Sequence, residues 1–219
     1  MPVAQLPALS MGEEIRNASS EDHEHSRRAL LKELKKSLHA QCDYTLPDDV
    51  MEAFLNAGEL LFYDSETPVT RAGDVDTNLY VVASGIIAYC HFDGDHERVT
   101  CFGTRGTLFL SYHSYLFGQG SYYEVLSCCP SQLLVIPRAH LDRIVAESHS
   151  FCQWLLRMSQ MQLYFFDMKN GVINGSARER YESMLTHRPE IIERVPLKII
   201  ASYLGITPQY LSVIRRDYR

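Results

Sequence analysis

The segment from residue 197 to residue 216 carries polar and basic side chains of the types that contact a DNA duplex. A glutamine such as Gln209 can hydrogen-bond both N6 and N7 of an adenine, and arginine side chains can bind backbone phosphates. Where a helix enters the major groove, base contacts come from its start, so arginines at its end would meet phosphate. We predict that the DNA-binding residues are Thr207, Gln209, Tyr210, Ser212, Arg215, Arg216 and Lys198.

The elements that would position these side chains are two short helices joined by a tight turn. The segment reads LKIIASYLGITPQYLSVIRR, with the small Ala201 where two helices would touch and Gly205 four residues later. Glycine suits the turn because it adopts the left-handed backbone without strain. Thr207 can cap the second helix, and Pro208 suits its first position. The sequence therefore predicts a helix-turn-helix whose inner faces are Ile200, Leu204, Ile206, Leu211 and Ile214.

The distribution of charge favours a local rather than a general affinity for DNA. The 219 residues have a net charge of −6 and a pI of about 5.8, which argues against a protein that covers nucleic acid or an anionic membrane with its whole surface. From Ser176 to the C-terminus, however, eight Lys or Arg residues stand against five Asp or Glu residues. The basic excess thus lies in the segment that would meet phosphate.

A long helix is predicted at residues 149–172, where apolar residues recur in alternating steps of three and four. This a/d heptad pattern is typical of helices that pair with each other. A second apolar face, which includes Leu155, Leu156 and Leu163, could pack on the helix's own domain. We therefore predict a parallel two-fold dimer; the alternative is a helix that only packs on its own domain. The predicted dimer interface is Phe151, Trp154, Met158, Met161, Phe165 and Met168.

The middle of the chain changes to short β-type runs separated by turn residues. Their regular spacing favours a sandwich or small barrel over a parallel α/β sheet. The runs are residues 60–63, 79–83, 86–92, 98–102, 122–127 and 133–136.

Four zones follow from these patterns, in an α+β fold. Residues 1–28 mix Ser, Glu, His and Asn without periodicity, which predicts a flexible arm. A β domain, a sandwich or small barrel, is expected over residues 29–148, with short helices near residues 30–38 and 48–57. The dimerisation helix and a hinge occupy residues 149–174. The helix-turn-helix domain covers residues 175–219, and no β-wing is expected after it.

This order of elements resembles the family of the cyclic-AMP receptor protein and Fnr-type transcription regulators, over roughly residues 29–219. The likeness is strongest in ERYESMLTHRPEIIERVPLKIIASYLGITPQYLSVIRR, which is similar to a short-tailed branch from Bacteroidetes-like genomes. The resemblance implies that residues 29–148 form an antiparallel β-roll sensor domain, a cyclic-nucleotide-binding-like jelly roll. It further implies a homodimer that places one recognition helix in each major-groove half-site, about 34 Å apart. It also implies a small-molecule effector in the roll, and RNA polymerase as a further candidate partner.

The segment GTLFLSYHSYLFGQGSYYEV departs from the cyclic-nucleotide binders of that family. Those proteins use a Glu for the ribose, where this chain has Tyr112, and an Arg for the cyclic phosphate, where Ser121 and Tyr122 provide no cation. A buried phosphate without a guanidinium would be costly. We expect no cyclic AMP binding, no cofactor, and an effector of unknown identity. The predicted effector pocket is Phe109, Tyr112, His113, Ser121 and Tyr122.

The recognition helix also departs from the family, whose members often have Glu and Arg where this chain has Gln209 and Val213. Val213 removes one contact between arginine and guanine. This change weakens any prediction of the operator sequence more than the prediction of DNA binding.

Several other classes of protein fit the sequence less well. No span is apolar enough to cross a membrane and no signal peptide is evident, so we expect a cytoplasmic, non-enzymatic protein. A cupin-like metal enzyme could use His91, His96 and Glu97, but these surround a predicted tight turn and would face water, so we predict no metal. A ligand-sensing module that acts through protein partners, with a degenerate DNA head, is the other alternative. Whether Cys128 and Cys129 have a redox role stays open.

Overall fold

The computed structural model describes residues 11–93, 96–172 and 175–218. Two helices come first, α1 (Met11–His39) and α2 (Asp48–Asn56). The strands that follow are β1 (Glu59–Tyr63), β2 (Thr67–Thr70), β3 (Leu79–Ser84), β4 (Ile87–Asp93), β5 (His96–Gly103), β6 (Leu108–Phe109), β7 (Tyr123–Ser127) and β8 (Ser131–Ile136). Helix α3 (Tyr112–Phe117) lies between β6 and β7, and the later helices are α4 (Arg138–Glu147), α5 (His149–Val172), α6 (Ala177–His187), α7 (Pro189–Arg194), α8 (Leu197–Leu204) and α9 (Pro208–Arg216).

The strands form two antiparallel sheets that together make a β-roll. One sheet has the order β1-β8-β3-β6, and the other has the order β2-β7-β4-β5. Alternate side chains of both sheets, such as Tyr80, Ile87 and Val125, pack together inside the roll. The predicted α+β fold with an antiparallel roll is therefore confirmed. Strands β2 and β6, of four and two residues, were not predicted because such short segments show no usable alternation of apolar and polar residues.

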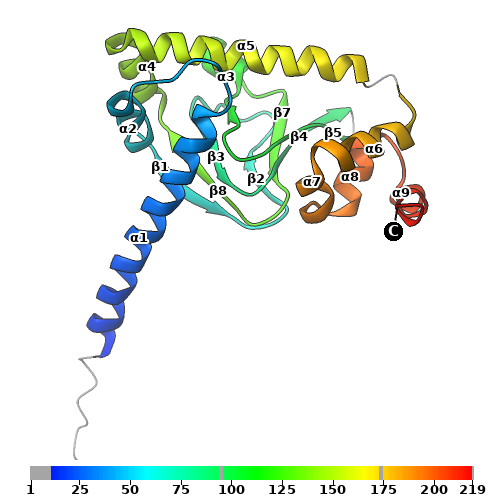
Figure 1. The fold of residues 1–219 in the computed structure, drawn as a ribbon, viewed down its shortest axis with the longest axis horizontal. Coiled ribbons are helices and arrows are strands. Elements are labelled where there is room, and N and C mark those ends of the chain that lie inside the picture. The colour runs from blue at the N-terminus through cyan, green and yellow to red at the C-terminus, as the bar shows by residue number, and fades with distance from the viewer. Residues whose placement is uncertain (1–10, 94–95, 173–174, 219) are drawn as a thin grey trace, which may run out of the picture.

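Helix α1 begins well before the helical pattern seen in the sequence. Residues 11–28, predicted as part of a flexible arm without periodicity, are helical as the first part of α1; residues 1–10 lie outside the described residues. The helix is fixed further along, where Leu34 and Leu38 are fully buried. Toward its start it is polar, with an ion pair of 3.0 Å between Arg28 and Glu24 one turn apart. Figure 1 shows α1 extending away from the roll.

Helix α5 crosses one side of the roll from end to end (Figure 1). It starts and ends at the predicted residues, His149 and Val172. With α1 and α2 it covers the outer face of the first sheet, where Phe54 contacts Trp154 edge-on at a ring distance of 5.5 Å. Trp154 is completely buried there.

The C-terminal helices, α6 to α9, rest on the second sheet of the roll. Their apolar side chains share one core with β4 and β5, in which Phe102 packs against Tyr203 at 5.0 Å. The backbone N–H of Val99 in β5 donates a hydrogen bond of 3.0 Å to the hydroxyl of Ser202 in α8. Figure 1 shows α9 at the outer edge of this group, beyond α8.

Candidate functional site

The helix-turn-helix forms as the sequence predicts. Helix α8 ends at Leu204, and Gly205 follows in the left-handed region with φ 65°. A β-carbon would strain the backbone at this residue. Thr207 caps α9 by accepting a hydrogen bond of 3.2 Å from the backbone N–H of Tyr210, and Pro208 is the first helical residue. Ala201 is completely buried where the two helices meet.

One side of α9 is buried and the opposite side faces solvent. Leu211 and Ile214 are completely buried in the core that α9 shares with helices α6 to α8, which together form the C-terminal head. Gln209, Val213 and Arg216 follow at helical steps of four and three, so they lie on one exposed face. Thr207, Tyr210 and Ser212 are also exposed, although the Ser212 hydroxyl donates to the carbonyl of Pro208 at 2.9 Å.

The basic residues of the head differ in their surroundings. Arg216 is exposed and Arg215 is half-buried at the end of α9. The Arg178 guanidinium forms an ion pair of 2.6 Å with Asp217, the residue directly after α9. Lys198 forms an ion pair with Glu66 in the turn between β1 and β2. This ion pair holds Lys198 toward the roll and away from the residues of α9, although Lys198 is predicted to bind DNA together with them.

The predicted dimer seam on α5 is wrong for three of its six residues. Phe151, Trp154 and Met158 are buried in the core of their own domain, so they cannot also meet a partner. A heptad pattern does not tell which of two apolar stripes faces the parent domain, and here the stripe with the larger side chains does. Met161 is half-buried, Phe165 is 61% exposed, and the side chain of Met168 lies outside the described residues.

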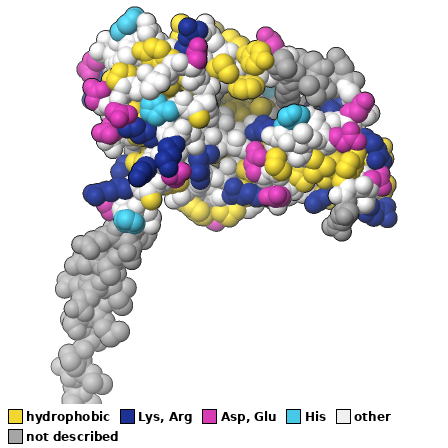
Figure 2. Space-filling model, viewed as in Figure 1, with side chains coloured by type: hydrophobic (Ala, Val, Ile, Leu, Met, Phe, Trp, Pro, Cys, Tyr) yellow, Lys and Arg dark blue, Asp and Glu magenta, His cyan; other side chains and the backbone are white. Residues whose placement is uncertain are grey.

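The second apolar stripe of α5 faces solvent instead. Leu156 is 59% exposed, Leu163 is 65% exposed, and Phe166 is 59% exposed. These residues follow at steps of seven and three, which also places them on one face in a heptad repeat. Figure 2 shows apolar side chains gathered along α5 at the top of the view. Such an apolar stripe on a long helix is typical of a protein–protein contact.

The five residues of the predicted effector pocket separate into two groups. Phe109 is buried in the roll, where it stacks on Tyr80 with ring centroids 4.8 Å apart. Tyr112 is the first residue of α3 and is 57% exposed. His113 follows Tyr112 in the first turn of α3 and contacts Tyr122 in the loop after the helix, where Ser121 also lies.

His113 and Tyr122 stack on each other, with ring centroids 4.1 Å apart. Nδ1 of His113 lies 2.8 Å from the carbonyl oxygen of Gly120, which can only accept, so Nδ1 carries the proton. In neutral His113, Nε2 then accepts from the Tyr122 hydroxyl at 3.0 Å. Ser121 is buried and its hydroxyl donates to the carbonyl of Tyr123 at 2.8 Å. His113 and Tyr122 thus bond to each other, while His113 and Ser121 also bond to the loop backbone.

Tyrosines occupy the inside of the roll around Phe109. Tyr89 contacts Phe109 edge-on at 5.9 Å and Tyr123 at 5.6 Å. Tyr123 donates its hydroxyl to the carbonyl of Leu110 at 2.7 Å, and burial raises the pKa of Tyr123 to about 12. Burial also raises the pKa of Tyr89, so both phenols are neutral at physiological pH. The roll therefore presents neutral aromatic groups where an anion would need a cation.

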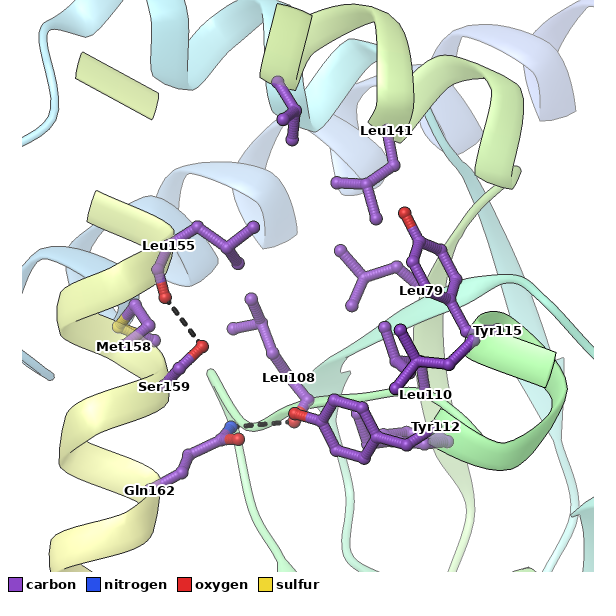
Figure 3. Close-up of a pocket in the computed structure, with 13 residues that line it drawn as sticks. Leu79, Leu108, Leu110, Tyr112, Tyr115, Leu141, Leu155, Met158, Ser159 and Gln162 are labelled. Atoms are coloured by element: carbon purple, nitrogen blue, oxygen red, sulfur yellow. Dashed lines mark hydrogen bonds between the residues drawn. The ribbon is translucent and has the colours of Figure 1, made fainter. Parts of the chain in front are cut away.

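A cavity that sequence reasoning did not find lies between α3, α4 and α5 (Figure 3). Its volume is about 240 Å³, and Tyr112 and Phe109 contribute to its wall. Ser159 and Gln162 of α5 also line it. Their polarity within a mostly apolar helix face was the signal in the sequence that could have located it.

Cys128 and Cys129 are buried in the core shared by the roll and the head. Burial alone does not distinguish between the two predicted roles of these cysteines, a redox pair or two small packing residues. Among the described residues, no group of three His, Cys, Asp or Glu side chains lies close enough to hold a metal ion. None of the described helices combines the length and the apolar character needed to span a membrane.

Comparisons with known proteins agree with this architecture. Residues 60–148 match the family described as cyclic nucleotide-binding domain. No curated protein sequence matches the chain. One similar solved structure is FixK2 from Bradyrhizobium japonicum, with a TM-score of 0.58 and 14% sequence identity; the match covers 73% of this chain and 83% of that chain. Another is the c-di-GMP-responsive global regulator CLP from Xanthomonas campestris, with a TM-score of 0.62 and 18% identity; the match covers 78% of this chain and 91% of that chain. A third is a mutant of CooA from Carboxydothermus hydrogenoformans, with a TM-score of 0.55 and 17% identity; the match covers 80% of this chain and 86% of that chain.

Proposed function

We propose that this chain, which has the fold of the Crp/Fnr-type regulators and a cyclic nucleotide-binding domain at residues 60–148, is a homodimeric regulator that binds specific DNA sequences. The observation that carries the proposal is α9, which is capped at Thr207, anchored by two buried residues, and exposed along Gln209, Val213 and Arg216. A helix with these properties can lie in the major groove while α8 supports it. Such a regulator would act in the cytoplasm, with RNA polymerase as a candidate partner.

The exposed stripe of α5 supports a dimer. Because Leu156, Leu163 and Phe166 repeat along one face, two copies of α5 could pair in parallel about a two-fold axis. That symmetry would present two α9 helices to successive major grooves, as a palindromic site requires.

The direct test is binding of the full-length protein to a pool of genomic fragments at near-physiological salt, followed by sequencing of the retained fragments. The proposal expects a recurring palindromic motif. Retention without any shared motif, or no retention, would contradict it and favour a sensor that acts through protein partners.

Cyclic AMP and cyclic GMP are expected to bind with dissociation constants weaker than about 10 µM, which corresponds to about −7 kcal/mol. The reason is that residues 106–123, which include α3 and the loop after it, contain no Lys or Arg, and an unpaired buried phosphate is costly. Titration calorimetry of the full-length protein measures this directly, with motif binding in the same buffer as the control for a native sample. A constant at or below 10 µM would refute this expectation.

Gln209→Ala is expected to relax the base preference at one position of each half-site, at about 1–3 kcal/mol. Gln209 is exposed near the start of α9, where side chains reach base edges. A binding-site selection with wild-type and variant protein measures the effect. Gln153→Ala, an exposed glutamine on α5, is the control. Identical motifs for wild type and Gln209→Ala would mean that Gln209 reads no base.

A further inference from the structure

The cavity between α3, α4 and α5 is enclosed mainly by leucine side chains (Figure 3). None of the residues that line it is a Lys, Arg, Asp or Glu. The Tyr115 hydroxyl, on a further lining residue, donates a hydrogen bond of 2.5 Å to Asp142. Burial and the Asp142 carboxylate raise the pKa of Tyr115 to about 12, so its side chain is neutral at physiological pH. The leucines are Leu79, Leu108, Leu110, Leu116, Leu141 and Leu155.

Most of the cavity lies outside the roll, although Phe109 of the roll interior contributes to its wall. Leu79 and Leu108 belong to the core on the α5 side of the first sheet, whereas their neighbours Tyr80 and Phe109 belong to the core within the roll. Successive residues of a strand point to opposite faces of a sheet. The leucine side of the cavity is therefore on the outer face of that sheet, next to α5, and Phe109 closes the cavity from the roll side.

The polar side chains that line the cavity belong to α5, with Ser159 and Gln162, and to α3, with Tyr112 and Tyr115. The Gln162 amide donates a hydrogen bond of 2.8 Å to the carbonyl of Leu108, which engages one of its two N–H groups. The Ser159 hydroxyl donates to the carbonyl of Leu155 at 2.8 Å, so its oxygen can still accept. Figure 3 shows Tyr112 and Gln162 together in the wall of the cavity.

We propose that this cavity binds a small uncharged molecule, apolar over most of its surface, with one hydroxyl or carbonyl group directed to Gln162 and Ser159. A charged ligand would lose its hydration without gaining a counter-ion from the wall. The volume of about 240 Å³ suits a molecule larger than benzene, since an engineered apolar cavity of about 150 Å³ binds benzene. One aromatic ring with a short side chain fits this size.

Binding at this place would act on α5. Leu155, Met158, Ser159 and Gln162 line the cavity, while Leu156 on the same helix belongs to the exposed stripe. A ligand that moves α5 would therefore alter the dimer contact and the position of the heads. This consequence rests on the proposed function, whereas binding itself does not.

The probe for the test is 2-phenylethanol, compared with 2-phenylethylammonium and phenylacetate, which have the same ring with a positive or a negative charge. Binding to the full-length protein is followed by the NMR shift of the Met158 methyl group, assigned with Met158→Leu. We expect a saturable shift with 2-phenylethanol and a dissociation constant of about 1 mM or tighter. The two charged probes should bind at least about tenfold more weakly. No saturable shift, or equal binding of the charged probes, would overturn the proposal.

Two cavity-filling variants on different helices locate the site. Ser159→Leu and Val145→Phe each add bulk to the wall and should weaken 2-phenylethanol binding at least about tenfold. The matched control is Val75→Phe, at an exposed valine in the loop before β3, which should leave binding unchanged. If neither filling variant weakens binding in a protein that still folds, the molecule binds elsewhere and the proposal is wrong.

Gln162→Leu tests the polar side of the cavity. It should reduce the preference for 2-phenylethanol over ethylbenzene by about two- to tenfold, the value of one hydrogen bond. An unchanged preference would overturn the assignment of Gln162. Failure of the protein to bind DNA would refute the proposed function but not this site, and failure of 2-phenylethanol to bind would refute this site but not the proposed function.

Discussion

Replacing Leu156 and Leu163 together by glutamate is expected to give a monomeric protein that no longer retains DNA. In the proposed dimer the two exposed side chains of each copy face those of the other, so the double variant would place four like charges along one seam. Burying unpaired charge in this way costs several kcal/mol. Light scattering measures the molar mass, and a gel-shift assay with a selected motif measures DNA binding.

The control for this experiment is Phe165→Glu, at a side chain of similar exposure. Phe165 is seven residues after Met158 and therefore lies on the same side of α5 as Met158, opposite Leu156. Because this side does not belong to the proposed seam, the variant should remain dimeric. If Phe165→Glu gives monomers and the double variant does not, the dimer uses the stripe originally predicted from the heptad pattern. Met158→Glu is uninformative about the dimer, because Met158 is buried in its own domain and a charge there would unfold it.

Replacing Arg215 and Arg216 together by alanine is expected to weaken binding to all DNA sequences alike and to flatten the salt dependence. Both arginines lie in the last turn of α9, behind the residues that would reach base edges. Each phosphate contact contributes about 0.9 to the slope of log K against log salt, so four lost contacts per dimer would reduce the slope by about 3 to 4. Fluorescence anisotropy over a series of salt concentrations measures the slope for a selected motif and for unrelated DNA.

The matched control removes an equal charge from a distant surface. Arg27 and Arg28 are adjacent arginines in α1, so Arg27→Ala with Arg28→Ala changes the net charge by the same amount. This variant should keep the wild-type slope. A slope that falls equally in both variants would show that net charge, and not contact by α9, determines DNA affinity. A loss confined to the selected motif in the Arg215 and Arg216 variant would mean that these arginines read bases.

The sequence by itself determined the elements that follow local rules. The helix-turn-helix depends on the left-handed turn at Gly205, the cap at Thr207 and the proline after it, and each of these works within a few residues of chain. The extent of α5 likewise follows from the apolar spacing of residues 149–172, which alternates between steps of three and four. The absence of a cation from residues 106–123 is a property of the sequence alone.

Only the tertiary structure decided what each face of those elements contacts. Periodicity shows that α5 has two apolar stripes, but Trp154 is buried and Leu156 is exposed because the first sheet and α2 happen to lie on one side. The hydrogen bond from Val99 to Ser202 joins residues 103 positions apart, and no local pattern predicts it. The cavity beside Gln162 arises in the same way, from three helices that meet over one sheet. Contacts between distant segments depend on how whole elements pack, and that information is not contained in the spacing of residues within any one of them.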